Sequence, residues 1–364
     1  MTELVDQWRA QALIDTQALE HNVEKIRERC GAARIMAVIK ANAYGHGLQI
    51  ISGTIANHVD GFAVATLAEG VECRKVQSSK PIVVLSEWWN AEQLGVFIEY
   101  QLQPVIHSEE QLEWIAAHRG DPLSLWLKID TGMNRLGISI NEWKSVCRRL
   151  SALSSVNNIT ILSHLANADD VSDGFTDQQI ATFESIVGES QHDHSLCNSA
   201  GLIQRPTSTY QWVRPGMMLY GGSPVVDQTA KQLNLRPVMH LKARILSTKE
   251  IANNQPVGYG GTRITSRKTI IGMVGVGYGD GYPRVVDDRA CVIVGGRRAP
   301  LIGRVSMDMI TIDITDLPSV KMGDEVTLWG AGLSVEEVAE WAGTIPYELL
   351  CKVTMRIPRV ILEV

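Results

Sequence analysis

Residues 34–47 read RIMAVIKANAYGHG, an apolar run of strand-forming residues that ends in Lys40. The run predicts a buried strand. An amine at the end of such a strand can lose its water shell, which lowers its pKa and frees it for Schiff-base chemistry. Gly45 and Gly47 allow the backbone to adopt a positive φ or to pass close to a ligand. A lysine that ends a strand is more often simply solvated. The rest of the chain must therefore show whether Lys40 is a reactive amine.

The same pattern of a strand followed by a helix recurs through the first two thirds of the chain. Most of the runs are continuously apolar, which is typical of strands buried on both faces of a parallel sheet. Eight such units favour a closed (β/α)8 barrel of the TIM type, with a doubly wound sheet as the alternative. The predicted strands are 34–40, 61–66, 81–86, 103–107, 123–130, 159–164, 194–198 and 212–220.

Several helices in this chain carry start signals. A capping box pairs a Ser or Thr with a Glu or Gln three residues later, and each side chain satisfies a backbone N–H of the first helical turn. The predicted boxes are Thr66 with Glu69, Ser108 with Gln111, Thr176 with Gln179, and Ser334 with Glu337.

After about residue 224 the pattern changes to strands separated by glycine-rich turns, with one helix at 334–343. This predicts a second, mostly β domain. We expect residues 12–228 to form the barrel and bind the cofactor, and residues 229–364, with an N-terminal strand within 1–11, to form the β-rich domain. A strand at 11–14 is expected to pack with the β-rich domain. Its other predicted strands are 238–251, 269–275, 290–294, 309–314, 325–328 and 360–364.

The composition excludes several classes of protein. A net charge of -6 over 364 residues gives no reason to expect nucleic acid as a partner. Six scattered cysteines without a C-x-x-C motif argue against a metal or disulfide framework and favour reduced thiols in a cytoplasmic enzyme. Residues 1–12 lack the features of a signal peptide. No apolar run approaches the ~18 residues of a membrane span.

Polar and charged residues follow the predicted barrel strands where catalytic groups of barrel enzymes usually lie. Each has an ordinary explanation, since a lone histidine is usually a core residue and a lone arginine usually belongs to a salt bridge. Their occurrence at one rim favours a site. The loops at 198–201 and 214–217 suit an anion such as phosphate, and a lysine beside a phosphate site is what pyridoxal 5′-phosphate requires. The candidates are Lys40, Tyr44, Lys128, Arg135, His164, Ser199, Arg214 and Gly216.

Seven motifs, in order along nearly the whole chain, resemble those of the alanine racemase family of fold-type-III pyridoxal-phosphate enzymes. The first alone is moderately specific, and the set together is highly specific. The motifs are VIKANAYGHG at 38–47, KIDTGMNRLG at 128–137, NSAG at 198–201, RPG at 214–216, VGYG at 257–260, GYGDGY at 277–282 and GRVSMDM at 303–309.

The resemblance implies roles for the barrel residues. Lys40 would hold the cofactor through a Schiff base, and Arg214 would face its pyridine nitrogen. Arg135 would position the substrate carboxylate beside Lys128, which is often carbamylated in this family. His164 would join a hydrogen-bond network with Tyr259 or Arg214. The residues that would bind the cofactor phosphate are Tyr44, Ser199, Gly216 and Met217.

The resemblance also implies that the β-rich domain serves a second subunit. Tyr259 and Met307 would enter the active site of the other subunit, so the functional unit would be a head-to-tail homodimer. Tyr278 is similar to a tyrosine at the substrate entrance. Asp308 would be a second supporting residue of the same site. No metal is implied.

The implied reaction is the interconversion of L-alanine and D-alanine, which supplies D-alanine for peptidoglycan in a bacterial cytoplasm. Racemisation needs a base on each face of the substrate carbon, and Lys40 and Tyr259 would be the two. A phenol has a pKa of about 10 and is a poor base at neutral pH. A neighbouring cation, either Arg214 or a charged His164, would favour its phenolate form.

Other activities remain open from the sequence. Met355 stands where some members of the family carry a tyrosine that contacts the phosphate, and a thioether cannot donate as a phenol does. This phosphate contact is therefore open, though the cofactor itself is not. Met307, Tyr278 and the region of Met355 could also widen the pocket, as in a broad-specificity or serine racemase. A fold-type-III amino-acid decarboxylase and a pyridoxal-phosphate carrier protein are further alternatives. The decarboxylase usually places an acid where Arg214 stands, and carriers usually lack the second domain.

Overall fold

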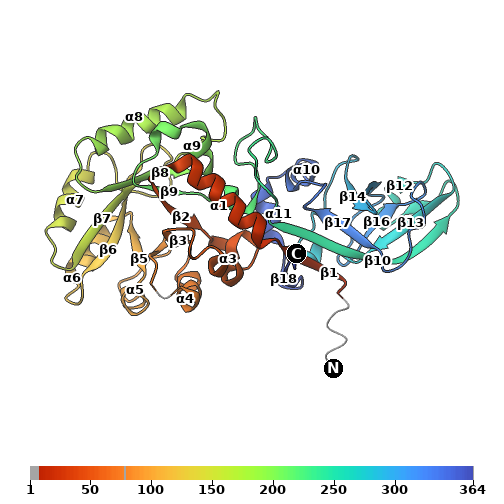
Figure 1. Cartoon of the computed structure of the whole chain (residues 1–364), viewed down its shortest axis with the longest axis horizontal. Coiled ribbons are helices and arrows are strands. Elements are labelled where there is room, and N and C mark those ends of the chain that lie inside the picture. The colour runs from red at the N-terminus through yellow and green to blue at the C-terminus, as the bar shows by residue number, and fades with distance from the viewer. Residues whose placement is uncertain (1–7, 78, 364) are drawn as a thin grey trace. The chain divides into compact units, whose positions relative to one another are not determined.

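The computed structural model describes residues 8–77 and 79–363, which separate into two compact units. The larger unit consists of Leu19–Ala43 and Leu48–Arg236. The other contains the described residues up to Ala18, the short segment Tyr44–Gly47, and the chain from Pro237 onward. Figure 1 labels the elements of both units, which are described separately below.

The larger unit contains a closed barrel of eight parallel strands, β2 to β9, in which each strand pairs with the next. The barrel closes where Arg34 and Ile35 of β2 pair with Trp212 and Val213 of β9. This confirms the predicted (β/α)8 barrel and excludes the doubly wound alternative. The strands are β2 (Arg34–Val38), β3 (Gly61–Val64), β4 (Ile82–Val84), β5 (Gln103–Ile106), β6 (Leu123–Lys128), β7 (Val156–Leu162), β8 (Asp193–Asn198) and β9 (Trp212–Arg214).

The last barrel strand is shorter than the predicted segment 212–220. It ends at Arg214, and a 3-10 helix, η2, follows at Met217–Tyr220. Pro215 has no N–H to donate to a neighbouring strand, so the ladder cannot continue through it. The apolar residues after it are buried in the 3-10 helix.

Helices follow the strands in this unit, as Figure 1 shows. The capping box of Thr66 and Glu69 is confirmed at the start of α4. The other two predicted boxes of this unit are wrong. Ser108 stands at the start of α6 without capping it, because Gln111 accepts a hydrogen bond from the backbone of His107 instead. Thr176 and Gln179 lie inside α8 and are buried. The helices are α1 (Thr16–Cys30), α2 (Lys40–Tyr44), α3 (Leu48–Thr54), α4 (Leu67–Val76), α5 (Leu94–Glu99), α6 (Glu109–Ala117), α7 (Trp143–Ser151), α8 (Phe175–Val187) and α9 (Ser199–Gln204), with the 3-10 turn η1 (Pro206–Ser208).

The other unit contains an eight-stranded sheet in the order β15-β14-β17-β10-β1-β18, with β13 joining β10 to β16. The N-terminal strand β1 pairs with β10, which confirms that it packs with the β-rich part. β18 pairs with β1, and Val364 of the predicted strand 360–364 lies outside the described residues, as do residues 1–7 of the predicted segment 1–11. The strands are β1 (Ala10–Ile14), β10 (Met239–Ile251), β13 (Thr269–Val274), β14 (Cys291–Val294), β15 (Arg297–Pro300), β16 (Ile310–Asp313), β17 (Glu325–Trp329) and β18 (Arg359–Ile361).

Short elements complete this unit. Three were not predicted: the paired strands β11 (Pro256–Val257) and β12 (Arg263–Ile264), and the helix α11 (Pro346–Lys352). β15 was also missed, because its two arginines conceal the alternation of a strand. Ser334 caps the predicted helix, observed as α10 (Val335–Trp341), with its side chain on the N–H of Glu337. Two 3-10 turns are η3 (Tyr259–Gly261) and η4 (Tyr278–Asp280).

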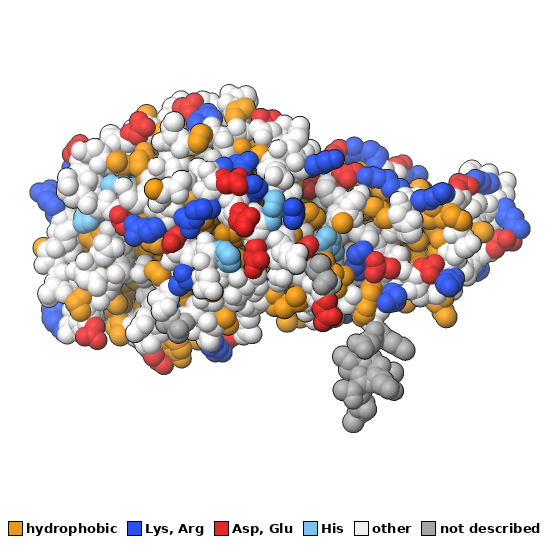
Figure 2. Space-filling model, in the orientation of Figure 1, with side chains coloured by type: hydrophobic (Ala, Val, Ile, Leu, Met, Phe, Trp, Pro, Cys, Tyr) orange, Lys and Arg blue, Asp and Glu red, His pale blue; other side chains and the backbone are white. Residues whose placement is uncertain are grey.

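The described helices include none that combines the length and the apolar character needed to cross a membrane. On the face shown in Figure 2, acidic and basic side chains are interspersed over both units. The surface in this view therefore presents mixed charge, in keeping with the modest net charge of the sequence.

Candidate active site

Lys40 lies two residues after Val38, the last residue of the first barrel strand, and begins a left-handed turn. Ala41, Asn42 and Ala43 have φ values of 53°, 53° and 54° with ψ near 50°, and Tyr44 has a φ of 51°. For non-glycine residues this conformation costs roughly 1–2 kcal/mol each. A hydrogen bond from the Ala43 N–H to Ile39 O, at 2.8 Å, closes the turn.

Two features after Lys40 hold the turn in place. Asn42, a residue type that tolerates left-handed backbone, accepts a hydrogen bond at 2.8 Å from the N–H of Leu48. Gly45 and Gly47 have φ values of 79° and 100°, as expected from the sequence. A Cβ atom on Gly45 would lie 2.0 Å from the carbonyl oxygen of Leu350, so no larger residue fits there. The strained turn thus fixes the direction in which the chain leaves Lys40.

Arg214, at the end of β9, is buried, and the barrel fixes its guanidinium. Its Nη1 donates to the Ser195 hydroxyl at 2.5 Å and its Nη2 to the backbone carbonyl of Ser163 at 2.5 Å. A longer contact of 3.5 Å joins Nη2 to Nδ1 of His164. The Nε–H has no acceptor among residues 8–77 and 79–363. Burial lowers the pKa of Arg214 to about 10, so the group is still a cation at neutral pH.

His164, at the end of β7, is held in its neutral form. Burial lowers the pKa of its imidazole well below the ordinary value, and the charges of Arg214 and Lys128 act in the same direction. The expectation that a charged His164 favours a phenolate is therefore wrong for this arrangement, because a second cation beside Arg214 would be repelled. Of His164 and Arg214, only Arg214 is therefore positively charged at neutral pH.

Lys128, at the end of β6, is a buried amine in a cationic neighbourhood. Burial lowers its pKa to about 8, and the charges of Arg135 and Arg214 add to this effect. Arg135 lies on the loop after β6, where the Asp130 carboxylate accepts hydrogen bonds from the backbone of Gly132 and Asn134. Asp130, which follows the strand that ends in Lys128, therefore stabilises the loop that carries Arg135. The charge of Lys40 also acts on Lys128, as expected for groups that share one barrel mouth.

Ser199, at the start of α9, lies beside Gly216 and the start of η2. Its hydroxyl oxygen accepts hydrogen bonds from the N–H groups of Gly216, at 2.8 Å, and Met218, at 3.3 Å. With both lone pairs in use, its hydrogen can only be donated, and no described residue accepts it. The first N–H groups of α9 and η2 have no intrahelical acceptor. Such a set of donors around a buried hydroxyl fits a phosphate group.

Tyr44 belongs to the β-rich unit together with the segment 44–47. Burial raises the pKa of its phenol, so it is neutral and able to donate. Its ring lies 5.8 Å from that of Tyr347, between centroids. A contact between Tyr44 and a phosphate at Ser199 stays a prediction.

The remaining predicted residues lie on exposed turns of the β-rich unit. Tyr259 begins η3 and is 72% exposed, Met307 is 53% exposed, and Tyr278 of η4 is 39% exposed. Asp308 forms an ion pair with Arg356 at 2.6 Å. Met355 is also exposed. The opposition of Lys40 and Tyr259, and any role of Met355 toward a phosphate, stay predictions.

Sequence reasoning missed the residues that support Arg214 and His164. The buried Ser195 hydroxyl donates a hydrogen bond to the Trp212 carbonyl and accepts one from the Arg214 guanidinium. Gln179, misread as part of a capping box, is fully buried and donates to the His164 carbonyl at 3.0 Å. Both are polar residues on an otherwise apolar strand or helix face. Because buried polar groups are usually hydrogen-bonded, this pattern could have identified them in the sequence. In the described part of the chain, no cluster of three His, Cys, Asp or Glu residues could hold a metal ion.

Comparison with known proteins adds two family matches. The family profile described as "Alanine racemase, N-terminal domain" matches residues 14–224, and "Alanine racemase, C-terminal domain" matches residues 238–361. The biosynthetic alanine racemase of Pseudomonas aeruginosa is 43% identical over 350 residues, which cover 96% of this chain and 98% of that protein. The catabolic alanine racemase of Pseudomonas putida is 42% identical over 353 residues, with the same coverage.

Solved structures agree with these matches. The crystal structure of the biosynthetic alanine racemase from Pseudomonas aeruginosa superposes with a TM-score of 0.95 at 41% identity, covering 98% of this chain and 100% of that one. An alanine racemase from Bartonella henselae with covalently bound pyridoxal phosphate gives a TM-score of 0.90 at 28% identity, with the same coverage.

Proposed function

Since the chain belongs to the alanine racemase family and has alanine racemase activity, we propose that it works with pyridoxal 5′-phosphate and two bases. Lys40 and Tyr259 are the bases, on opposite faces of the cofactor. The observation that carries the proposal is the convergence of Lys40, the buried cation Arg214 and the Ser199 donor set on one barrel.

The residues of the barrel fit the proposed cofactor. Lys40 would hold it covalently, the Ser199 hydroxyl and the N–H group of Met217 would donate to its phosphate beside Gly216, and Tyr44 would donate to the same phosphate. Arg214 would direct its unused Nε–H to the ring nitrogen. When bound, the cofactor withdraws electrons from the α-carbon of the amino acid and so makes the α-proton acidic.

Arg214 has a chemical consequence at this position. A guanidinium that remains protonated donates to a ring nitrogen and cannot accept a proton from it. With the cofactor bound, Arg214 would therefore leave the ring nitrogen largely unprotonated, and the electron withdrawal would be weaker than beside a carboxylic acid. Ser195 and the Ser163 carbonyl hold the guanidinium in one orientation. We infer that this arrangement limits side reactions such as transamination.

The proton transfers are assigned to two side chains. Racemisation removes the α-proton from one face of the carbon and returns a proton to the other face. Lys40 serves one face once its amine is released to act as a base. Tyr259 of the partner subunit serves the other, and its phenol needs a nearby cation to act as a base at neutral pH. Because His164 is neutral, Arg214 is the cation of the barrel that can supply this effect.

The exposed turns of the β-rich unit support a dimer. Soluble monomers rarely expose large apolar side chains in groups, and such groups usually mark an interface. A head-to-tail homodimer would cover them and bring Tyr259 and Met307 to the other subunit's barrel. The exposed apolar residues of this unit include Tyr259, Ile264, Val285, Met307 and Met355.

Lys128 is proposed to carry a carbamate. Only the neutral amine reacts with carbon dioxide: its nitrogen bonds to the carbon, and a proton leaves to solvent. A pKa of about 8 makes the neutral form available near neutral pH. The resulting carboxylate would pair with Arg135 and hold it for the carboxylate of alanine.

The test separates the proposed activity from its alternatives. The purified protein is incubated with L-alanine, with serine in parallel, and both enantiomers and released carbon dioxide are measured. D-alanine formed faster than D-serine supports the proposal, comparable rates indicate a broad-specificity racemase, and carbon dioxide indicates a decarboxylase. Absence of all three products would indicate a carrier. Lys40→Ala should abolish racemisation, and Lys144→Ala, at an exposed lysine of α7, is the matched control that should leave it unchanged.

Supply of D-alanine for peptidoglycan in the cytoplasm is the proposed cellular role. The relatives include both a biosynthetic and a catabolic alanine racemase, at 43% and 42% identity. A D-alanine requirement of cells that lack the gene, on medium without alanine as a carbon source, would support the biosynthetic role.

A further inference from the structure

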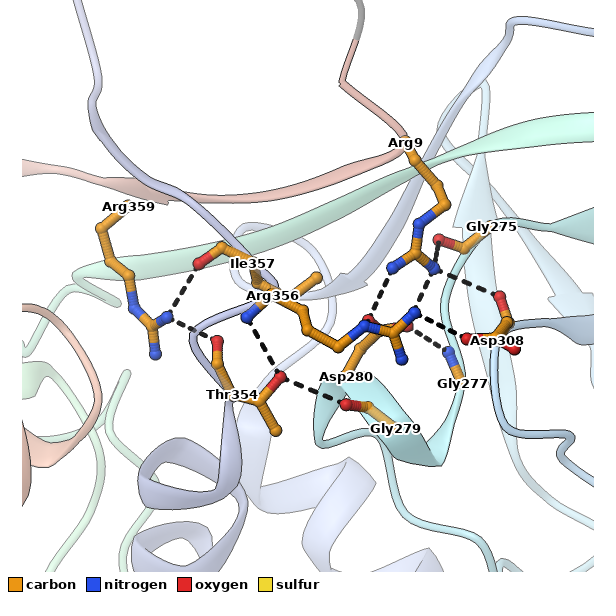
Figure 3. A network of polar contacts seen from close by, with 10 residues as sticks. All are labelled: Arg9, Gly275, Gly277, Gly279, Asp280, Asp308, Thr354, Arg356, Ile357 and Arg359. Carbon is orange, nitrogen blue, oxygen red and sulfur yellow. Dashed lines mark hydrogen bonds and ion pairs between the residues drawn. The ribbon is translucent and has the colours of Figure 1, made fainter.

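Asp280 is a carboxylate with no exposed side-chain surface, at the end of the turn η4 in the β-rich unit. Figure 3 shows it between two arginines from distant parts of the chain. Arg9 donates to both carboxylate oxygens, at 2.6 and 2.9 Å, and the Nε of Arg356 lies 3.5 Å from one of them. The Gly277 N–H donates to the carboxylate at 2.9 Å.

The charge of Asp280 is matched by its surroundings. Burial alone would raise the pKa of this carboxyl, but hydrogen bonds from Arg9 and Gly277 outweigh burial and hold the pKa below its ordinary value. A buried carboxylate of this kind cannot lose its partners without a large penalty. The carboxylate and its two arginines are therefore expected to move as a unit.

Two loops meet at this carboxylate, which we call the η4 loop (residues 277–281) and the Met307 loop (residues 306–308). The Tyr278 N–H donates to Ser306 O at 3.0 Å, and the Gly279 N–H donates to Met307 O at 2.9 Å. Arg9 and Arg356 then bind Asp308, at its carbonyl (3.2 Å) and its carboxylate (2.6 Å) respectively. The arginines that hold the η4 loop thus also hold the Met307 loop.

Close backbone contact explains the glycines of the GYGDGY motif. A Cβ atom on Gly277 would lie 2.4 Å from the carbonyl oxygens of both Ser306 and Met307. On Gly279 it would lie 2.5 Å from Nη1 of Arg356. The two loops are therefore in direct backbone contact at Gly277, and the Arg356 guanidinium occupies the space that a side chain at Gly279 would need.

A third segment braces the η4 loop from the other side. The Thr354 N–H donates to Asp280 O at 3.0 Å, and its hydroxyl donates to Gly279 O at 3.2 Å. Arg359 in turn donates to Thr354 O at 2.7 Å, as Figure 3 shows. Asp280 is therefore the point at which three separate segments are joined.

Tyr278 and Met307 project from these loops with 39% and 53% of their surface exposed, so packing in their own unit covers only part of each side chain. Their positions depend on the two loop backbones. We propose that Asp280, clamped by Arg9 and Arg356, is a positioning residue that holds Tyr278 and Met307 in the geometry that binds substrate in the partner subunit's active site. This inference rests on the proposed function, which assigns both side chains to that site.

The first test compares Asp280→Asn with Asp316→Asn in the purified holoenzyme. Asparagine keeps the size but loses the charge that both arginines require. Asp316 forms an exposed pair with Arg267 in the same unit, away from the two loops, and is the matched control. We expect Asp280→Asn to raise KM for alanine roughly tenfold, since hydrogen bonds to a buried charge are lost, with a smaller change in kcat. The control should leave both unchanged.

Amide hydrogen exchange provides a readout that does not depend on activity. Asp280→Asn should accelerate exchange in peptides that cover the η4 loop and the Met307 loop, while the cofactor absorbance stays the same. A merely structural role would instead lower the amount of active, cofactor-loaded enzyme at unchanged KM. Unchanged exchange in both loops, or an unchanged KM, overturns the inference.

A second variant covers the case in which Asp280→Asn fails to fold. Arg356→Gln releases the Asp308 carboxylate but leaves the bidentate contact between Arg9 and Asp280. It should raise KM by a few-fold and accelerate exchange in the Met307 loop more than in the η4 loop; equal exchange in both would count against the inference. Failure of the proposed function is recognised separately, because the unmodified protein would then not racemise alanine.

Discussion

The left-handed turn after Lys40 allows the energetic cost of positioning this lysine to be measured. Ala41 has a φ of 53° and its methyl group is exposed, so Ala41→Gly changes the backbone preference and little else. Glycine adopts positive φ without the steric penalty of a Cβ atom. The substitution therefore removes strain at one position of the turn while the hydrogen bonds around it remain.

The expected magnitude follows from two opposing effects. Removing the left-handed penalty stabilises the folded state by roughly 1–2 kcal/mol. Glycine loses more backbone freedom on folding than alanine, which costs about 0.5–1 kcal/mol. At the middle of these ranges the net stabilisation is about 0.5–1 kcal/mol, which raises the melting temperature by about 1–4 °C for a unit of this size.

Ala181→Gly is the matched control, since Ala181 is also exposed but lies within the right-handed helix α8. There glycine should destabilise the protein by about 1 kcal/mol. The assay is thermal unfolding of both variants under the same conditions, with the cofactor present. Opposite signs are expected. If Ala41→Gly lowers the melting temperature as much as Ala181→Gly does, the turn is not strained and positioning Lys40 carries no energetic cost.

Three further predictions concern the chemistry. Arg214→Glu should raise transamination relative to racemisation, because a carboxylic acid allows the ring nitrogen to be protonated; unchanged partitioning to pyruvate would count against the role of Arg214. Tyr259→Phe should slow α-proton exchange from one enantiomer of alanine more than from the other, and equal deuterium wash-in from both would contradict two bases. Because the pKa of Lys128 is lowered to about 8, its neutral fraction rises as pH increases toward 8. Carbon-13 NMR with labelled carbon dioxide should therefore show a carbamate that strengthens over this range at constant dissolved carbon dioxide; a signal that persists in Lys128→Arg would show that it arises elsewhere.

The barrel could be predicted because its signals are local. Strands such as β3 and β4 are fully buried runs, and their spacing along the chain sets the number of units. The left-handed turn could not be predicted in the same way. Nothing in the residues Ala41 to Ala43 favours positive φ except Asn42, and the conformation depends on hydrogen bonds with Ile39 and Leu48 and on the close contact at Gly45.

In the candidate site too, some features could be predicted from the sequence and others depend on the folded structure. Strand ends identified Lys40, Lys128, His164 and Arg214, because position along a barrel strand determines where a side chain lies. The charge on His164 was misjudged, since it depends on burial and on cations brought near by folding.

Capping boxes illustrate the limit of short motifs. Thr66 with Glu69 and Ser108 with Gln111 look alike in sequence. Only the first forms, because folding directs the side chain of Gln111 to the backbone of His107.

The central claim is that Lys40 holds the cofactor, and borohydride reduction tests it most directly. The purified protein should absorb at about 420 nm with pyridoxal phosphate bound, as expected for a lysine-linked cofactor. Reduction should abolish this band and attach the cofactor irreversibly, and peptide mass spectrometry should find the added mass on Lys40. A colourless protein that takes up no pyridoxal phosphate, or a cofactor fixed on another lysine, would contradict the account.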